Sequence, residues 1–522
     1  MRTTKITVAL LLAFSVFALT APAQGKMTYT LSMEDPSSHV FHLSFQWDKV
    51  EAPLVDFRMP NWMPGYYQLI PYSRMVRNFR VTDAAGKALS WEATTTSTWR
   101  VARGASSTIV LSYDIDVSKQ LEGVPNVAQS WLDSSHAYIA PAGIFLYPEG
   151  EKQHAVSLKI AAFAGWSRVA TGLDSVAGGK FVYTAPDFDI LYDCPILAGN
   201  LEELPSFSVK GVPHYFIGYQ MGEFDRAAFM DELKKVVEAG INVIGDIPYR
   251  HYTFLGIGSG RGGVEHLNST TVPFEGSSLR TDAGRHRVLN FLAHEYFHLY
   301  NVKRIRPIAL GPFDYGQENL TNMLWVSEGF TVYYEYLTVL RAGLMNGDEL
   351  LKDLQSNIAA YENKPGHLLQ SATRSSYETW LYGPLVKPEI ADKMISYYDK
   401  GPVLGMLLDF AIRHQTSNQR SLDDVMRILY KEFYQEKKRG FTDSEFQQVC
   451  ERVAGTSLAE IFEYASTVKD IDYVKYLAYA GLAIDQSPVE LPGNKTGKSW
   501  KISRMPAPDA LQLAIRKAWS GE

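Results

Sequence analysis

Two histidines four residues apart, His294 and His298, have the clearest capacity for chemistry in this chain. Each residue of a helix turns by about 100°, so positions four apart share a face and both imidazoles can bind one metal ion. Glu295 completes the pattern His-Glu-x-x-His and lies close enough to serve as a general base for a water beside that ion. The spacing predicts a catalytic zinc site. An exposed helix with two incidental histidines is the weaker interpretation.

A catalytic zinc ion takes three protein ligands and keeps one position open. Glu328 is the preferred third ligand, because a carboxylate among bulky apolar residues is costly unless it is paired or bound to a metal. Glu335 and Glu318 are its rivals, and a salt bridge is the alternative role for Glu328. One zinc ion per chain is therefore expected, held by His294, His298 and Glu328.

Helical periodicity predicts the elements that position these ligands. A helix over 284–303 carries the histidines, with Asp282 as its candidate N-cap and an apolar face at Val288, Leu292 and Leu299. A second helix over 323–344 carries Glu328. Further upstream, the pattern predicts strands at 212–219 and 252–257 and, between them, a helix over 225–239 closed by Gly240.

The first part of the chain has a β pattern instead. Segments 40–47, 108–117 and 154–160 mix alternation with β-branched and aromatic residues, and turn signals separate them. This predicts a multidomain protein: an N-terminal antiparallel β-sandwich over 24–205, then a catalytic domain over 206–482 with an α+β lobe to about 345 and a helical lobe after it, and a tail over 483–522.

The N-terminus has the composition of an export signal. Arg2 and Lys5 precede an apolar run, and Ala21-Pro22-Ala23 offers a small-residue cleavage site. Residues 1–23 are therefore expected to be a signal peptide, and the mature protein to be periplasmic or secreted, without membrane insertion. The apolar run is shorter than the roughly 20 residues that span a bilayer.

Composition narrows the possible partners. The chain has 522 residues, 46% hydrophobic and 21% charged, as expected for a globular protein of several domains. Loss of Arg2 and Lys5 takes the net charge from −6 to −8, and no basic stripe is visible, so nucleic acid is not an expected partner. Cys194 and Cys450 are predicted to be buried thiols rather than a disulfide.

The extended zinc motif resembles one particular family. The segments 294–307 and 324–331, together with 62–66 and 192–196, resemble peptidase family M61, the glycyl aminopeptidase family, over roughly residues 27–481. The resemblance implies a thermolysin-like zincin of the gluzincin group, whose third ligand is a glutamate, here Glu328. Members usually carry a PDZ domain after the helical lobe. Fewer than fifty residues follow Gly481, so this domain is expected to be missing or reduced to a remnant.

Resemblance to the related M1 aminopeptidases suggests a substrate site at Gly262-Gly263-Val264-Glu265-His266. The segment is similar to their G-x-M-E-N motif, with His266 and Val264 as departures. The resemblance implies that Glu265 binds the α-amine of the substrate, while Gly262 and Gly263 let the peptide backbone approach. A glycine-rich turn with a solvated Glu265 is the alternative.

Tyr398 resembles the tyrosine of the M1 Y-E-K-G motif, which implies that it donates to the oxyanion of the transition state. Its neighbour Tyr397 is the alternative donor. Lys303, Arg304 and Arg306 could contact a peptide carboxylate, although cations are also expected near the C-terminus of any helix.

Together these features predict a zinc-dependent aminopeptidase that acts on peptides with a free N-terminus. By resemblance, the preferred first residue is small, Gly or Ala. In this mechanism Glu295 is the general base and Tyr398 the oxyanion donor. Two alternatives remain: a gluzincin endopeptidase that does not use Glu265 for the amine, and a catalytically silent exported binding protein. The intact Glu295 argues against the second.

Overall fold

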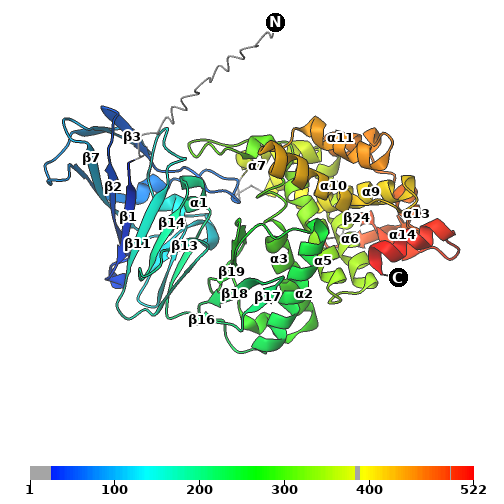
Figure 1. The fold of residues 1–522 in the computed structure, drawn as a ribbon. Helices are drawn as coiled ribbons and strands as arrows, with labels where there is room; N and C mark the ends of the chain where they lie inside the picture. Colours follow the sequence, from blue (N-terminus) through cyan, green and yellow to red (C-terminus); the bar gives the residue numbers. More distant parts are fainter. Residues whose placement is uncertain (1–24, 383–387, 494, 522) are drawn as a thin grey trace, which may run out of the picture.

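The computed structural model describes residues 25–382, 388–493 and 495–521. The predicted signal peptide, residues 1–23, lies outside the described residues. Figure 1 shows the sheet-rich N-terminal part on the left, a smaller mixed lobe at the centre and a helical lobe on the right. This arrangement confirms the predicted fold class, a β domain followed by an α+β catalytic region with a helical lobe.

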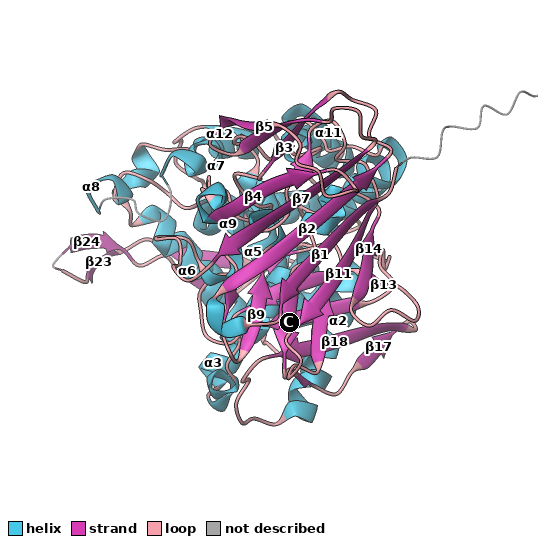
Figure 2. Cartoon of the chain, turned by 90° about the vertical axis from the view of Figure 1, so that its left-hand side faces the viewer, coloured by secondary structure: helices cyan, strands magenta, loops and turns pink. Residues whose placement is uncertain are grey.

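The described residues of the N-terminal domain form three sheets, in which buried residues alternate along the longer strands. In β1 (Met27–Met33), Tyr29 and Leu31 are fully buried, while the residues between them are partly exposed. The largest sheet, which faces the viewer in Figure 2, has the order β13-β14-β11-β1-β2-β7-β4 within the described residues. One pair, β1 with β11, is parallel, so the predicted antiparallel sandwich needs this correction.

The other strands of this domain form a sheet of order β10-β3-β6-β5 and a sheet of order β12-β15-β9-β8. Cys194 is buried in this domain, and Cys450 is buried in the helical lobe. Both are free thiols, as predicted. The strands and the single α-helix of the domain are β2 (Val40–Asp48), β3 (Leu54–Arg58), β4 (Val76–Thr82), β5 (Trp91–Thr95), β6 (Thr98–Ala102), β7 (Thr108–Asp116), β8 (Trp131–Leu132), β9 (His136–Ile139), β10 (Tyr147–Pro148), β11 (Val156–Ala162), β12 (Arg168–Thr171), β13 (Asp174–Ser175), β14 (Val182–Ala185), α1 (Phe188–Tyr192) and β15 (Ile196–Gly199).

The mixed lobe has a sheet of order β16-β18-β19-β21-β20, with β17 beside β18. The helix α2 (Arg226–Ile244) packs against α3 (Asp282–Phe297) and runs beyond its predicted end. Gly240 lies inside it, where a side chain would meet the Tyr296 ring, and Gly245 with φ +92° ends it instead. The strands are β16 (Glu202–Glu203), β17 (Phe207–Val209), β18 (Val212–Gly218), β19 (Tyr252–Gly256), β20 (Val264–Glu265) and β21 (Ser269–Val272).

The helix α3, which carries His294, spans Asp282–Phe297 and is shorter than predicted. Its N-cap is Thr281, whose hydroxyl accepts the Gly284 N–H, and not Asp282. The helix ends with His298 as its C-cap, and the chain then turns through Val302, whose φ of +109° is incompatible with a helix.

The helix predicted over 323–344 is two helices, α4 (Leu324–Ser327) and α5 (Gly329–Arg341), which meet at Glu328. The lobe continues with α6 (Gly347–Glu362), α7 (Ala372–Tyr382), α8 (Pro388–Ala391), α9 (Tyr397–Gln415), α10 (Leu422–Leu429), a π-helical turn η8 (Tyr430–Lys437), α11 (Asp443–Ala454), α12 (Ala459–Ser466) and α13 (Tyr473–Ala478).

The tail folds back onto the helical lobe. It contains β22 (Leu482–Asp485), β23 (Pro488–Leu491), β24 (Lys495–Lys498), β25 (Lys501–Arg504) and α14 (Ala510–Ser520). The strands pair β22 with β25 and β23 with β24. The Trp519 indole N–H donates to the Tyr333 hydroxyl at 2.8 Å, and both side chains are buried. The tail is therefore docked on the helix that follows Glu328.

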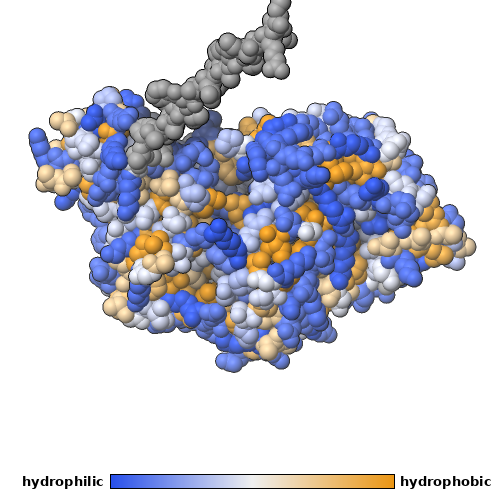
Figure 3. All heavy atoms as spheres, viewed as in Figure 1, coloured by the Kyte–Doolittle hydropathy of each residue, from blue (hydrophilic) through white to orange (hydrophobic). Residues whose placement is uncertain are grey.

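Hydrophilic residues cover most of the face shown in Figure 3, and apolar residues form separate patches on it. Within the described part of the chain, none of the helices combines the length and the apolar character that crossing a membrane requires.

Candidate metal centre

The structure brings His294, His298 and Glu328 into one buried cluster, in which the ligand atoms lie within 4.8 Å of one another. The two Nε2 atoms are 3.0 Å apart. The Glu328 Oε2 atom lies 3.2 Å from His298 Nε2 and 3.7 Å from His294 Nε2. The three side chains predicted as ligands therefore point at a common position.

Each imidazole is oriented by a partner on its other nitrogen. His294 Nδ1 lies 2.7 Å from Glu335 Oε2, and His298 Nδ1 lies 2.8 Å from the Asn301 carbonyl oxygen. A carbonyl can only accept and a carboxylate accepts when ionised, so both Nδ1 atoms carry the proton in this arrangement. Both Nε2 atoms then turn a lone pair toward Glu328. Three acceptors this close repel one another unless a cation lies between them, which fits a metal site.

Electrostatics in the cluster favour a positive charge. Burial lowers the pKa of His294, but the Glu328 and Glu335 carboxylates outweigh it and hold that pKa well above 6.5. His298 behaves in the same way, with Glu328 as the main opposing influence on its pKa. In return, the two histidines overcome the effect of burial and lower the pKa of Glu328. The site is poised to hold either a proton or a metal cation between these groups.

The two alternative third ligands, Glu335 and Glu318, lie outside the cluster. Glu335, on α5, contacts the far nitrogen of His294 and so lies behind the ligand rather than in the cluster. Glu318 is exposed on a loop. Asn301 was not singled out by sequence reasoning, yet its side-chain amide donates to the Val326 carbonyl at 2.8 Å and to the Ser327 carbonyl at 3.1 Å. It connects the turn after α3 to the junction between α4 and α5, where Glu328 lies.

Glu295 is buried, and its Oε2 atom has no hydrogen-bond partner among the described residues. Burial raises its pKa to about 7, against the lowering effect of the two histidines. Gly263 lies directly against it, since a Cβ there would fall 2.1 Å from Glu295 Oε1. A carboxylate with one free oxygen and this proton affinity suits a general base.

Glu265 lies on β20, at the edge of the six-stranded sheet, and is also buried. A Cβ on Gly65 of the N-terminal domain would lie 2.8 Å from Glu265 Oε2, so this carboxylate is covered by a loop of the β domain. No ion pair of Glu265 occurs within the described parts of the chain. A cationic amine that entered the cleft would supply that missing partner.

Tyr398 lies in the cleft, with its ring centroid 6.3 Å from that of His294 and 40% of the residue exposed. Tyr397 is buried, and its hydroxyl lies 3.2 Å from Thr379 Oγ1, so Tyr398 is the better placed of the two. Gly329 and Gly401 let α5 and α9 approach: a Cβ on Gly329 would lie 2.4 Å from Gly401 Cα. Desolvation and then the charge of Glu328 raise the pKa of Tyr398 well above 10, so it remains a donor.

Tyr67 is a site residue that sequence reasoning missed. Its hydroxyl donates to Glu328 Oε1 at 3.0 Å from a loop of the β domain, and both side chains are buried. Its position directly after the segment 62–66, which resembles peptidase family M61, could have pointed to it. The β domain therefore contacts the third predicted ligand.

A cleft of about 680 Å³ lies beside the cluster. His294, Glu295 and Tyr398 line it together with Gly262 and Gly263, and Gly263 lies directly against Glu295. Its remaining walls are Gly65, Tyr66, Pro125, Val127, Ala283, His286, Arg287, Asn290, Phe291, Val332, Glu335, Tyr336 and Asp353.

The remaining candidates lie outside this cleft. His266 Nδ1 is 3.3 Å from Asp193 Oδ1, which is a structural contact. Lys303 pairs with the same carboxylate at 2.5 Å. Arg304 donates to backbone carbonyls, among them that of Leu299 at 2.7 Å. Arg306 borders a different pocket, together with Lys303 and Arg304.

Comparisons with known proteins agree with this geometry. Residues 28–200 match the model of the peptidase M61 N-terminal domain, and residues 287–404 match that of the M61 glycyl aminopeptidase. A search of curated proteins finds no match. An aminopeptidase N family protein from Idiomarina loihiensis has a similar fold, with a TM-score of 0.83 and 24% identity over 90% of this chain and 81% of that chain.

Two more distant structures share the fold. An M1 zinc metallopeptidase from Deinococcus radiodurans has a TM-score of 0.52 and 14% identity, over 86% of this chain and 95% of that one. Legionella pneumophila aminopeptidase A, in complex with aspartic acid, has a TM-score of 0.53 and 13% identity, over 85% of this chain and 49% of that one.

Proposed function

Because this chain belongs to peptidase family M61 and is a metallo-aminopeptidase, we propose that it is a zinc enzyme that removes small first residues, Gly or Ala, from peptides with a free N-terminus. The observation that carries the proposal is the convergence of His294 Nε2, His298 Nε2 and Glu328 Oε2 on one buried position. Two imidazoles and one carboxylate are a ligand set that zinc prefers.

Zinc in this position supplies a Lewis acid that polarises the scissile carbonyl and acidifies water. Glu295 takes the proton from the attacking water and passes it to the leaving amine, a role that fits its buried carboxylate and its pKa of about 7. Tyr398 donates its hydroxyl proton to the oxygen on which negative charge develops. In the same transition state, Glu295 accepts a proton from the water and Tyr398 stabilises the negative charge on the carbonyl oxygen.

Glu265 pairs with the substrate's α-ammonium and fixes the first peptide bond beside the metal ligands. Its place on the edge strand β20 supports this role, because an extended peptide can pair with the edge of a sheet. The preference for small first residues is supported by the walls of the cleft near Gly262 and Gly263. A Cβ on Gly262 would lie 3.5 Å from Val127 Cγ2 and one on Gly263 would lie 2.8 Å from Phe291 Cζ, so these two side chains restrict the space there.

We also propose that the N-terminal signal directs export of the protein, which then acts on peptides in the periplasm or outside the cell. The alternative activity is that of an endopeptidase, which would keep the three ligands and ignore the amine.

The decisive experiment compares hydrolysis of alanine amide substrates with free and N-acetylated amino groups. The wild type is expected to favour the free amine by about a hundredfold or more in kcat/KM, and Glu265→Gln to lose most of that preference. Glu318→Gln, an exposed carboxylate off the cleft, is the matched control. Equal rates on both substrates would contradict the aminopeptidase activity and favour an endopeptidase. Purified protein without stoichiometric zinc would contradict the assignment of zinc as the cofactor.

A further inference from the structure

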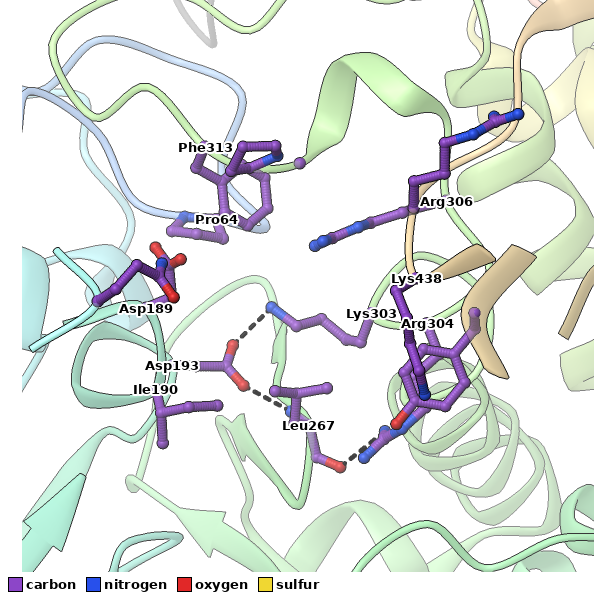
Figure 4. A pocket seen from close by; sticks show the side chains of 15 residues that line it. Pro64, Asp189, Ile190, Asp193, Leu267, Lys303, Arg304, Arg306, Phe313 and Lys438 are labelled. Carbon is purple, nitrogen blue, oxygen red and sulfur yellow. Dashed lines mark hydrogen bonds and ion pairs between the residues drawn. The ribbon is translucent and has the colours of Figure 1, made fainter. Parts of the chain in front are cut away.

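A second pocket, of about 470 Å³, lies on the other side of the loop that carries Gly65. The β domain, the turn after the zinc helix and the π-helical turn η8 with the residues after it all contribute to it (Figure 4). Its charged lining residues are Lys303, Arg304, Arg306, Lys438, Arg439, Asp189 and Asp193. Five of these are cationic and two are acidic, which gives the pocket an excess of positive charge.

Both acidic residues are already engaged by donors of the protein. Asp193 accepts the Leu267 backbone N–H at 2.7 Å and pairs with Lys303 at 2.5 Å. Asp189 accepts the Tyr315 hydroxyl proton at 2.6 Å. Lys303 therefore balances the charge of Asp193, and four cations remain in the lining against the carboxylate of Asp189.

Two of the arginines are engaged as well. Arg304 donates to the backbone carbonyls of Leu299 and Leu267. Arg439 forms a bidentate pair with Glu445, with distances of 2.9 and 2.7 Å. In both arginines, some of the guanidinium N–H groups therefore already donate to the protein and are not free to bind a ligand.

Arg306 differs from them. Its guanidinium lies 5.6 Å from the centroid of the Phe313 ring and makes no hydrogen bond or ion pair within the described residues. Gly311 leaves room for it, since a Cβ there would lie 2.3 Å from Arg306 Cζ. Figure 4 shows the side chain extended into the pocket. Desolvation lowers its pKa, and the negative charges of Asp189 and Asp193 offset this lowering only in part.

Lys438 is the second cation without an ion pair in the described parts of the chain. Its ammonium lies 5.8 Å from the centroid of the Tyr434 ring, and the residue is exposed at the rim. An anion in the pocket would therefore meet the planar guanidinium of Arg306 inside and the exposed ammonium of Lys438 at the entrance. A guanidinium fork matches two oxygens of a tetrahedral or carboxylate anion.

We propose that this pocket is a binding site for a small multivalent oxyanion of the phosphate or carboxylate class, held by Arg306 and closed by Lys438. The volume exceeds what a halide needs and admits an anion with several oxygens. This site is separate from the peptidase cleft and is formed by residues that take no part in the proposed reaction.

The bound anion contacts two segments that also shape the peptidase cleft, the loop before Gly65 and the segment after Glu265. Pro64 lines the pocket and directly precedes Gly65, which covers Glu265. Leu267 lines it two residues after Glu265. Occupancy is therefore expected to stabilise the native enzyme, because a ligand that binds only the folded state adds its binding free energy to stability.

The test is thermal unfolding of the zinc-loaded full chain with increasing sulfate or phosphate, at an ionic strength held constant with sodium chloride. The wild type is expected to show a saturable rise in Tm with both anions, and Arg306→Gln a loss of affinity of about tenfold or more. Lys438→Met is expected to weaken binding less. Arg80→Gln, which removes the same charge from the exposed face of β4, serves as the control and keeps wild-type affinity.

Zinc content, measured before and after each titration, separates this site from anions that bind the metal. If Arg306→Gln does not fold, Arg306→Lys keeps the charge but loses the fork, and weaker binding by that variant supports the proposal. A saturable shift of equal affinity in Arg306→Gln or Arg306→Lys overturns it, as does the absence of any saturable shift in the wild type. Glu295→Gln, altered only in the cleft, is expected to bind the anion like the wild type.

Discussion

The metal end and the amine end of the cleft are built in different ways. His294 and His298 meet because they lie four residues apart at the end of α3, so one helix turn suffices to pair them. Glu265 acquires its surroundings only when a loop of the β domain lays Gly65 against it. The comparison teaches that the ability to bind a metal is local in sequence, whereas the shape of the substrate site depends on how the domains pack.

The largest effect is expected at the locally encoded end. Glu295→Gln keeps the shape of the side chain but removes the proton acceptor, so kcat should fall by about 10³- to 10⁴-fold. Zinc content should stay unchanged, because Glu295 is not among the three converging ligands. Steady-state kinetics and metal analysis of the same preparation check this. A variant that keeps wild-type kcat contradicts the assigned general base.

Tyr398→Phe tests a residue that reaches the cleft from the distant helix α9. Loss of one oxyanion donor should lower kcat by about 10²- to 10³-fold with little change in KM. The matched control is Tyr397→Phe, since that residue is buried and its hydroxyl lies 3.2 Å from Thr379 Oγ1. If the two variants lose activity in reverse order, Tyr397 is the donor.

Features that depend on neighbouring residues could be predicted from the sequence. The roles of Glu265 and Tyr398, which depend on how distant segments pack, were predicted only from the family resemblance. Helix spacing gave the histidine pair, and the cost of burying a carboxylate pointed to Glu328. The helix end at Phe297 was missed because the turn depends on the positive φ of Val302, which apolar periodicity does not reveal. Tyr67 and Asn301 were missed because their contacts to the ligand region join segments far apart in the chain.

Glu335→Gln tests how far the metal end depends on its surroundings. The Glu335 carboxylate orients His294 through Nδ1, so its neutralisation should weaken zinc affinity by about 10- to 100-fold. Competition with a chromogenic chelator measures this. Asp353→Asn is the matched control, because that carboxylate holds His286 at 2.8 Å in the same cleft without touching a ligand. Equal losses in both variants would show a general effect of charge rather than a role for Glu335.

Tyr67→Phe gives the smallest expected effect and addresses the comparison most directly. The change removes one hydrogen bond from the β domain to Glu328, and a bond to a charged group contributes about 1.5–3 kcal/mol. Part of that loss should appear as zinc affinity weakened by about tenfold, because the carboxylate is no longer held in one orientation.

Tyr72→Phe provides the control for this last variant. Tyr72 is a buried tyrosine of the same region whose hydroxyl donates to the Ala128 carbonyl at 2.5 Å, within the β domain. It should lose stability while keeping wild-type zinc affinity. If Tyr67→Phe also destabilises without weakening zinc, then the β domain shapes only the substrate end, and the metal end is independent of domain packing.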